Sequence, residues 1–211
     1  MNVRFVSAVL SASLLATGMV CADEPRSDLK NDSNRSALKA TIDTCSTCHG
    51  PNGHSVAPTF PNLAAQRAPY IELQLHAFKD QTRADPDAQA YMWGMASLLS
   101  DAMITELAEY FAKQPPAAGR AGGTPVLIAQ GKQIFEEGVP TRQIPACASC
   151  HGPRAEGMAS FPRLAGQHAP YLLKQLLVIQ SVLRTAPVMH GVIKDLTRDQ
   201  MEAVVTYLAS R

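Results

Sequence analysis

The chain carries the heptapeptide Cys45-Ser46-Thr47-Cys48-His49-Gly50-Pro51, and 102 residues later it carries Cys147-Ala148-Ser149-Cys150-His151-Gly152-Pro153. Further elements recur in the same order, with small losses of register that fall between them, where loops tolerate deletion. These elements are Phe60-Pro61-Asn62-Leu63-Ala64 with Phe161-Pro162-Arg163-Leu164-Ala165, Gln66 and Ala68-Pro69-Tyr70 with Gln167 and Ala169-Pro170-Tyr171, and Met92 and Gly94 with Met189 and Gly191. Ordered repetition of this kind indicates two homologous halves.

The segments around the two halves set the expected organisation of the chain. Residues 1–22 read as a secretory signal, because Arg4 precedes an apolar stretch and small residues stand before Asp23. Residues 114–125 are rich in proline and glycine and have the composition of a linker. We therefore expect a signal peptide over 1–22, a first domain over 23–117 and a second over 118–211.

Hydrophobic periodicity predicts a mostly helical fold with long loops and no convincing strand. Ser100 and Thr197 stand at helix N-cap positions, and Pro69 and Pro170 suit the first turn of another helix in each half. The segments expected to be helical ahead of the two cysteine motifs are 35–44 and 126–137. Two closing helices are expected to bury apolar faces, one made of Ile104, Leu107, Ala108 and Phe111, the other of Met201, Val204, Val205 and Leu208.

The Cys-x-x-Cys-His pattern in an exported chain indicates covalent attachment of haem c. Two thiols three residues apart on a helical turn can add to the two vinyl groups of one porphyrin, and the next residue points an imidazole at the iron. A redox disulfide would need a βαβ context that is missing from the sequence. A zinc site of four sulfurs would not require a histidine after each pair. We therefore expect two haem c groups, held by Cys45, Cys48 and His49 and by Cys147, Cys150 and His151.

The second axial ligand of each iron decides between an electron carrier and an enzyme. Methionine opposite histidine closes the iron and raises its reduction potential. Met92 and Met189 are the methionines that correspond in the two halves and precede a glycine by the same step, so we predict that they are the ligands. Among the other methionines, Met95 matches Val192, and Met158 has no equivalent in the first half.

Four other histidines compete with these methionines as ligands. His190 adjoins Met189, but its counterpart in the first half is Trp93, which cannot bind iron. His54, His76 and His168 also lack a histidine at the matching position. We expect all four to be solvated or hydrogen-bonded side chains.

Other matched residues predict the surroundings of the haem. The loops that begin at Phe60 and Phe161 are expected to pack against the haem, with a carbonyl holding the ligand imidazole. A second set could donate to the propionates, with helix packing or capping as an equally plausible role: Tyr70, Tyr171, Gln74 and Gln175.

Charge excludes one class of partner. The chain has 19 basic and 18 acidic side chains, and removing the signal takes away one cation, Arg4. A chain so balanced does not offer the basic surface of a nucleic-acid-binding protein. Beyond the signal, no stretch is apolar enough to cross a bilayer.

The ordered motifs resemble those of the cytochrome c4 family: His-Gly-Pro after the haem cysteines, Phe-Pro-x-Leu-Ala, Gln-x-Ala-Pro-Tyr, and Met-x-Gly before Leu-Ser or Leu-Thr. The resemblance covers nearly the whole chain after the signal. It implies an all-α fold of two tandem class I cytochrome c domains related by pseudo-twofold symmetry, with propionates meeting near the interface. It further implies a periplasmic electron carrier, loosely held at the inner membrane, that feeds a terminal oxidase. One departure is Ala40, which stands where a glycine usually precedes the first cysteine motif.

Three functions fit the motifs to different degrees. A di-haem electron carrier that serves a membrane respiratory complex, a terminal oxidase or a dehydrogenase is favoured, and such a protein is not an enzyme. The electron-accepting subunit of a flavin dehydrogenase, of the sulfide-oxidising flavocytochrome type, is the alternative. A di-haem peroxidase would need an iron with an open position, which two matched methionines disfavour.

Overall fold

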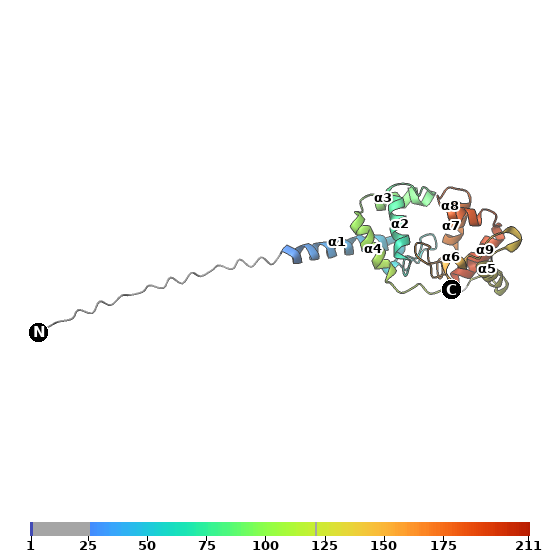
Figure 1. The fold of residues 1–211 in the computed structure, drawn as a ribbon, viewed down its shortest axis with the longest axis horizontal. Coiled ribbons are helices and arrows are strands. Elements are labelled where there is room, and N and C mark those ends of the chain that lie inside the picture. The colour runs from blue at the N-terminus through green and yellow to red at the C-terminus, as the bar shows by residue number, and fades with distance from the viewer. Residues whose placement is uncertain (2–25, 121) are drawn as a thin grey trace. The chain divides into compact units, whose positions relative to one another are not determined.

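The computed structural model describes Met1 and residues 26–120 and 122–211, and these are helical with long connecting loops (Figure 1). Residues 2–22 of the expected signal, which was predicted over 1–22, lie outside the described residues. The helical elements of the first half are α1 (Arg26–His49), η1 (Pro51–Gly53), α2 (Ala68–Lys79), the π-helical turn η2 (Ala88–Met92), α3 (Trp93–Ser97) and α4 (Asp101–Ala112). Those of the second half are α5 (Pro125–Glu137), η3 (Pro140–Arg142), α6 (Ala148–His151), α7 (Ala169–Gln180), α8 (Pro187–Ile193) and α9 (Arg198–Ala209).

β pairing in the described part of the chain is limited to two isolated bridges, Val139 with Ile144 and Met158 with Phe161. This confirms the all-α prediction. None of the helices in that part is long and apolar enough to cross a bilayer.

The expected helix boundaries are confirmed at the closing helices. The Ser100 hydroxyl accepts a hydrogen bond from the Met103 N–H and starts α4. Thr197 and Gln200 form a reciprocal capping box at the start of α9. Pro69 and Pro170 occupy the first turns of α2 and α7, where a missing N–H costs nothing.

The two halves approach their cysteine motifs by different routes. In the first half α1 runs without a break from Arg26 to His49. In the second half α5 ends at Gly138, where φ is 75°, and a reverse turn leads to the separate helix α6. The motif itself ends in a helical turn in both cases.

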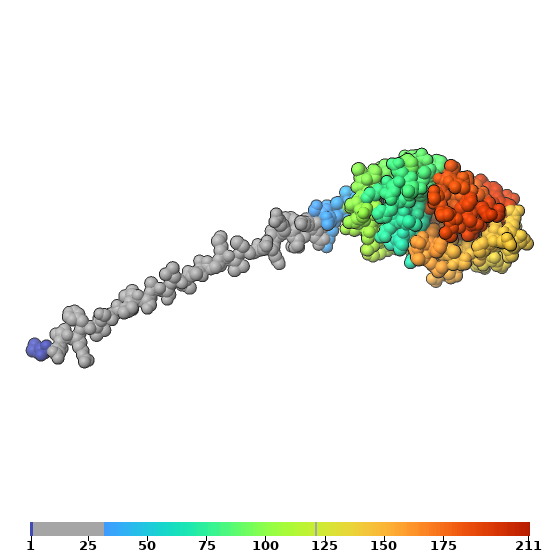
Figure 2. All heavy atoms as spheres, turned by 45° about the horizontal axis from the view of Figure 1, so that its top comes forward, coloured from blue at the N-terminus to red at the C-terminus, as the bar shows by residue number. Residues whose placement is uncertain are grey.

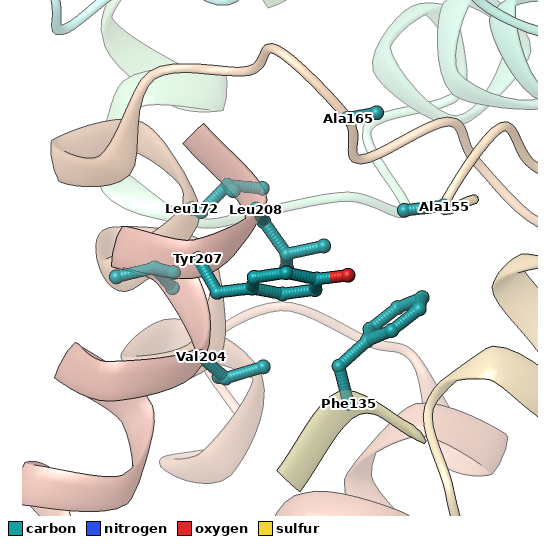
Figure 3. Packing of buried hydrophobic residues seen from close by; sticks show 8 residues of the cluster. Phe135, Ala155, Ala165, Leu172, Val204, Tyr207 and Leu208 are labelled. Atoms are coloured by element: carbon teal, nitrogen blue, oxygen red, sulfur yellow. The ribbon is translucent and has the colours of Figure 1, made fainter. Parts of the chain in front are cut away.

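Each half has its own core, built on the closing helix. In the first half Ile71 on α2 packs with Leu107, Ala108 and Phe111 on α4. In the second half Phe135 on α5 packs against Val204, Tyr207 and Leu208 on α9, with the Phe135 and Tyr207 rings 5.7 Å apart (Figure 3). Both apolar faces predicted from the sequence are buried.

Residues 36–211 form one unit by contact. Helices α2, α3 and α4 group together, as do α5, α7, α8 and α9 (Figure 1). The two halves, green and orange in Figure 2, lie side by side. Of the expected linker over 114–125, residues 114–120 and 122–124 contain no helix or strand, and Pro125 begins α5. The Arg120 N–H donates to the Ala209 carbonyl.

Candidate functional site

The two cysteine motifs are presented on helical turns. Cys45, Cys48 and His49 occupy the last turn of α1, and Cys150 and His151 lie on α6 with Cys147 at its N-cap. A Cys-x-x-Cys pair on one turn places both thiols on the same side of the helix, beside the histidine that follows. Cys45 packs against the first-half core and Cys147 against the second-half core, so each pair belongs to its own half.

Three of the four cysteines in the described part of the chain, Cys45, Cys147 and Cys150, are partly buried, and Cys48 is exposed. None of the four forms a disulfide there. Burial raises the pKa of the Cys45 thiol, and it raises the pKa of Cys147 to about 11. The thiols of these two residues are therefore neutral at physiological pH, which suits an apolar pocket.

The imidazoles of His49 and His151 are buried and oriented by the same contact in both halves. His49 Nδ1 lies 2.9 Å from the Pro61 carbonyl oxygen, and His151 Nδ1 lies 2.9 Å from that of Pro162. A carbonyl only accepts hydrogen bonds, so Nδ1 of each ring carries the proton and Nε2 keeps its lone pair. Burial also lowers the pKa of both imidazoles, which favours the neutral form that binds metals.

The Phe-Pro-x-Leu loops supply these carbonyls, as the sequence predicted. Each loop also places its phenylalanine edge-on to the histidine, with ring centroids 6.1 Å apart for Phe60 and His49 and 6.3 Å for Phe161 and His151. A metal-binding histidine generally donates the N–H of its second ring nitrogen to an acceptor such as these proline carbonyls, because that hydrogen bond fixes the ring orientation and the tautomer.

A continuous cavity of about 520 Å³ is lined by both histidines and by both predicted methionines. Met92 ends the π-helical turn η2, and π-helical turns occur often at functional sites. Trp93 follows it and donates its indole N–H to the Arg83 carbonyl at 2.9 Å. Met189 lies in the first turn of α8, which begins at Pro187.

The remaining methionines lie elsewhere. Met95 and Met158 are 56% and 43% exposed, and Met201 is fully buried in the second-half core. Met103 packs against the first-half core. Among the methionines of the described residues, Met92 and Met189 are those that line the cavity.

The competing histidines have other partners. His190 Nδ1 lies 3.0 Å from the Ile179 carbonyl oxygen, and His168 Nε2 lies 3.0 Å from that of Ser55, in the other half. His190, His168, His54 and His76 are absent from the described lining of the cavity. This arrangement agrees with the expectation that His190 and His168 are hydrogen-bonded side chains.

A buried pair of arginines between the halves was missed by the sequence reasoning. Arg83 and Arg184 are 7% and 8% exposed and line the cavity. They stand 101 residues apart, the same separation as Gln74 and Gln175, so the repeat contained the signal. Gln74 Oε1 accepts from Arg83 Nη1 and from Arg184 Nη2, at 2.8 Å each.

Tyr70 belongs to the same cluster. Its hydroxyl oxygen accepts from Arg184 Nη2 at 3.0 Å. Burial would raise the pKa of Tyr70, but the guanidinium groups of Arg184 and Arg83 hold that pKa below its usual value. Tyr70, Gln74 and Gln175, expected to donate to propionates, thus place their oxygens toward guanidinium groups.

These residues fit two haem c groups by the chemistry of their donors. The cavity is lined by Cys45 from the first half, by Cys147 and Cys150 from the second, and by an imidazole and a methionine thioether from each half, within a mainly apolar wall. The Gln175 Nε2 atom is buried and has no hydrogen-bond acceptor among the described residues. A buried donor without a partner is costly, so an acceptor such as a propionate carboxylate suits this position.

Comparisons with known proteins agree with this geometry. The family model of cytochrome c matches residues 38–114 and again residues 128–211. The chain is 35% identical to cytochrome c4 of Pseudomonas aeruginosa over 99% of this chain and 98% of that protein. It is 42% identical to the solved structure of Acidithiobacillus ferrooxidans cytochrome c4, with a TM-score of 0.75, over 79% of this chain and 98% of that chain.

A relative with a different printed role is also similar. The thiosulfate dehydrogenase electron acceptor of Thiomonas intermedia is 36% identical, over 80% of this chain and 78% of that protein. Its name describes a protein that receives electrons from an oxidising enzyme.

Proposed function

The chain belongs to the cytochrome c4 family of di-haem electron carriers, and we propose that His49 with Met92 and His151 with Met189 are its axial iron ligands. Its cofactors are two covalently bound haem c groups, one in each cytochrome c domain, and it is an electron-transfer protein and not an enzyme. Cys45 and Cys48 hold the first haem through thioethers, and Cys147 and Cys150 hold the second.

One observation carries the ligand proposal: each half contributes one histidine and one methionine, at matching positions, to the wall of the same cavity. When bound, haem iron supplies a one-electron ferric–ferrous couple. The residues of this chain fix the surroundings of that couple. The proline carbonyls hold each imidazole by Nδ1. Met92 and Met189 would hold the iron through their thioethers, and an iron held by both histidine and methionine would leave a substrate no free position.

Arg83 and Arg184 are proposed to bind propionates between the halves. Two buried guanidinium groups line the cavity, but only one of them, Arg83, forms an ion pair among the described residues, with Asp85 at 2.8 Å. Buried charges are generally paired. The carboxylates of the propionates would supply the missing negative charge and accept from Gln175 Nε2.

The proposed place of the protein is the periplasm, with residues 1–22 as a cleaved signal and domains over 23–117 and 118–211. Covalent attachment through Cys-x-x-Cys-His in a chain with such a leader supports export. Its partners are redox proteins. Among them we propose a membrane respiratory complex that ends in a terminal oxidase, with loose association at the inner membrane.

A second role is supported by the similarity to a thiosulfate dehydrogenase electron acceptor. In that role the chain would receive electrons from a dehydrogenase that oxidises a sulfur compound. The same two haem sites serve either role, because the donor protein and not the site decides the source of electrons. The flavin dehydrogenase subunit considered from the sequence is the same kind of role with another donor.

Replacement of the methionines tests the ligand proposal. Met92→Ala and Met189→Ala should each abolish half of the sulfur–iron charge-transfer band of the oxidised protein, and the double variant should abolish all of it. Met95→Ala and Met158→Ala are matched controls, because these side chains are exposed and lie away from the cavity. Full retention of the band in the double variant would refute the assignment.

Electron transfer with defined donors tests the physiological role. The reduced protein is mixed with membranes of its source, and the oxidised protein is mixed with thiosulfate and a purified thiosulfate dehydrogenase. Haem oxidation in the first mixture and haem reduction in the second are followed optically. Rapid oxidation by membranes through a terminal oxidase supports the first role, and reduction by thiosulfate through the dehydrogenase supports the second.

A further inference from the structure

The peptide group between Pro61 and Asn62 forms hydrogen bonds in two directions. Its carbonyl oxygen, on Pro61, accepts from His49 Nδ1–H at 2.9 Å. Its N–H, on Asn62, donates to Gln167 Oε1 in the other half at 2.8 Å. A single peptide unit therefore connects the proposed iron ligand of the first domain to a side chain of the second domain.

The second domain repeats the arrangement in the opposite direction. The Pro162 carbonyl accepts from His151 Nδ1–H at 2.9 Å, and the N–H of the same peptide group, on Arg163, donates to Gln66 Oε1 at 2.7 Å. Gln66 and Gln167 occupy equivalent positions in the two halves. The connection is thus reciprocal, as a pseudo-twofold interface requires.

Both glutamines are held by more than one contact. Gln167 Nε2 donates to the Asn62 carbonyl at 2.9 Å, and Gln66 Nε2 donates to the Arg163 carbonyl at 3.0 Å. Each amide therefore pairs with both backbone groups of one residue in the other half. This two-point contact fixes the amide orientation, so the oxygen always faces the peptide N–H.

The connections are shielded from water. Gln66 and Gln167 are 7% and 6% exposed, and Asn62 is 8% exposed. Hydrogen bonds in such an environment polarise one another, so an acceptor at one end of a peptide group strengthens the acceptor at its other end. Hydrogen bonding to ligand histidines is one of the means by which a protein sets the potential of haem.

We propose that Gln66 and Gln167 are positioning residues that tune the haem of the opposite domain through the Pro162–Arg163 and Pro61–Asn62 peptide groups. The proposal rests on the assignment of His49 and His151 as iron ligands. Gln167 Oε1 accepts a hydrogen bond from the Asn62 N–H. This bond polarises the peptide group and makes the Pro61 carbonyl a stronger acceptor. The His49 ring gains anionic character, which stabilises ferric iron and lowers the potential of its haem.

Loss of either glutamine acceptor should therefore raise the potential of the haem in the other domain. Gln167→Leu is expected to raise the potential of the His49 haem and leave that of the His151 haem nearly unchanged, and Gln66→Leu should do the reverse. The potentials are measured on the purified di-haem protein by redox titration, with haem methyl NMR signals reporting each haem separately. The proposal predicts that each variant shifts the potential of the haem in the opposite domain and not that of its own domain.

Two further variants keep the test decisive. Gln167→Asn retains an amide but withdraws its oxygen from Asn62, so it should shift the same haem even if the leucine variant incorporates haem poorly. His168→Ala is the control for a loosened interface, since it removes a cross-domain hydrogen bond to Ser55 without touching either peptide group. Burial lowers the pKa of His168, so its loss at neutral pH removes no charge.

The outcomes separate this proposal from the ligand assignment. An unchanged potential, equal shifts of both haems, or the same shifts in His168→Ala would overturn the proposal while the sulfur–iron band remains intact. Loss of that band in the glutamine variants would instead show that the effect operates through altered ligation, which also contradicts the proposal. Failure of the assignment itself appears in the methionine variants and not in these.

Discussion

Arg83 and Arg184 donate to the same acceptor atom, Gln175 Oε1, at 2.9 Å and 2.6 Å. Two buried guanidinium groups that share one neutral acceptor carry like charges at short range. Asp85 offsets one of those charges, and the matching position of the second half is Ala186. The pseudo-twofold symmetry therefore does not extend to the buried charges, because the carboxylate beside Arg83 has no counterpart beside Arg184 at the matching position.

Replacing Arg184 by glutamine should lower the reduction potential of the protein. A nearby positive charge favours the ferrous state, which is the less positive form of the haem, so its removal favours ferric iron. A shift on the order of 50 mV is expected for one charge at this depth, given that 59 mV is a tenfold change for one electron. Redox titration measures it, and Arg198→Gln is the control, because Arg198 is exposed and pairs with Glu202 on the surface.

Replacing Asp85 by alanine should have the opposite effect on potential and should also destabilise the fold. Asp85 is fully buried, and its loss leaves Arg83 without its ion-pair partner. Breaking a buried pair by removing one member costs about 3–5 kcal/mol. Denaturant unfolding measures that loss and redox titration the rise in potential. Asp101→Ala, which removes an exposed partner of Lys79, should cost far less, because exposed ion pairs contribute little to stability, and an equal cost would contradict the argument.

Gly131→Ala should destabilise the second domain, because α5 and α9 cross at this glycine. A Cβ atom at residue 131 would lie 2.0 Å from the Ala203 carbonyl oxygen and 2.8 Å from the Tyr207 Cβ. Forcing the helices apart costs about 1–3 kcal/mol, against a helix-propensity gain of about 1 kcal/mol. Gly191→Ala, in α8 with nothing within 4 Å, should be neutral or slightly stabilising. Thermal unfolding of the two variants compares them directly, and equal Tm values would show that the helices adjust without cost.

Much of the fold could be predicted because its signals are local. The caps at Ser100 and Thr197 are visible in a few neighbouring residues, and the apolar faces of α4 and α9 follow from periodicity alone. The site residues were found because duplication separates Met92 and Met189 from the other methionines. The structure places these residues on one cavity, and their role as ligands stays a prediction.

The contacts between the halves could not be read in the same way. A repeat shows that Gln66 and Gln167 are equivalent, but equivalence does not reveal which groups of the other half they contact. Arg83 and Arg184 followed the same 101-residue separation, yet an isolated arginine gives no sign in the sequence that it will be buried. Such burial depends on tertiary packing, which brings Gln74 and Gln175 to both guanidinium groups.

The buried His168 should make the stability of the protein depend on pH. Burial lowers the pKa of this imidazole below its ordinary value of about 6.5. Between the folded pKa and about 6.5 the unfolded chain therefore binds more protons at this residue than the folded one. The free energy of unfolding then rises with pH across that window and falls as the solution is acidified below about pH 6.5.

His168→Gln isolates this contribution, because a glutamine amide can still donate to the Ser55 carbonyl but does not titrate. The variant should lose part of the decline of stability between pH 7 and pH 5, by at most about 1.4 kcal/mol per pH unit for one group. Denaturant unfolding of both proteins at several pH values gives the two slopes. Above pH 8 the curves should run parallel, since His168 is then neutral in both states. Identical slopes below pH 6.5 would mean that His168 accepts its proton as readily in the folded protein as in the unfolded chain.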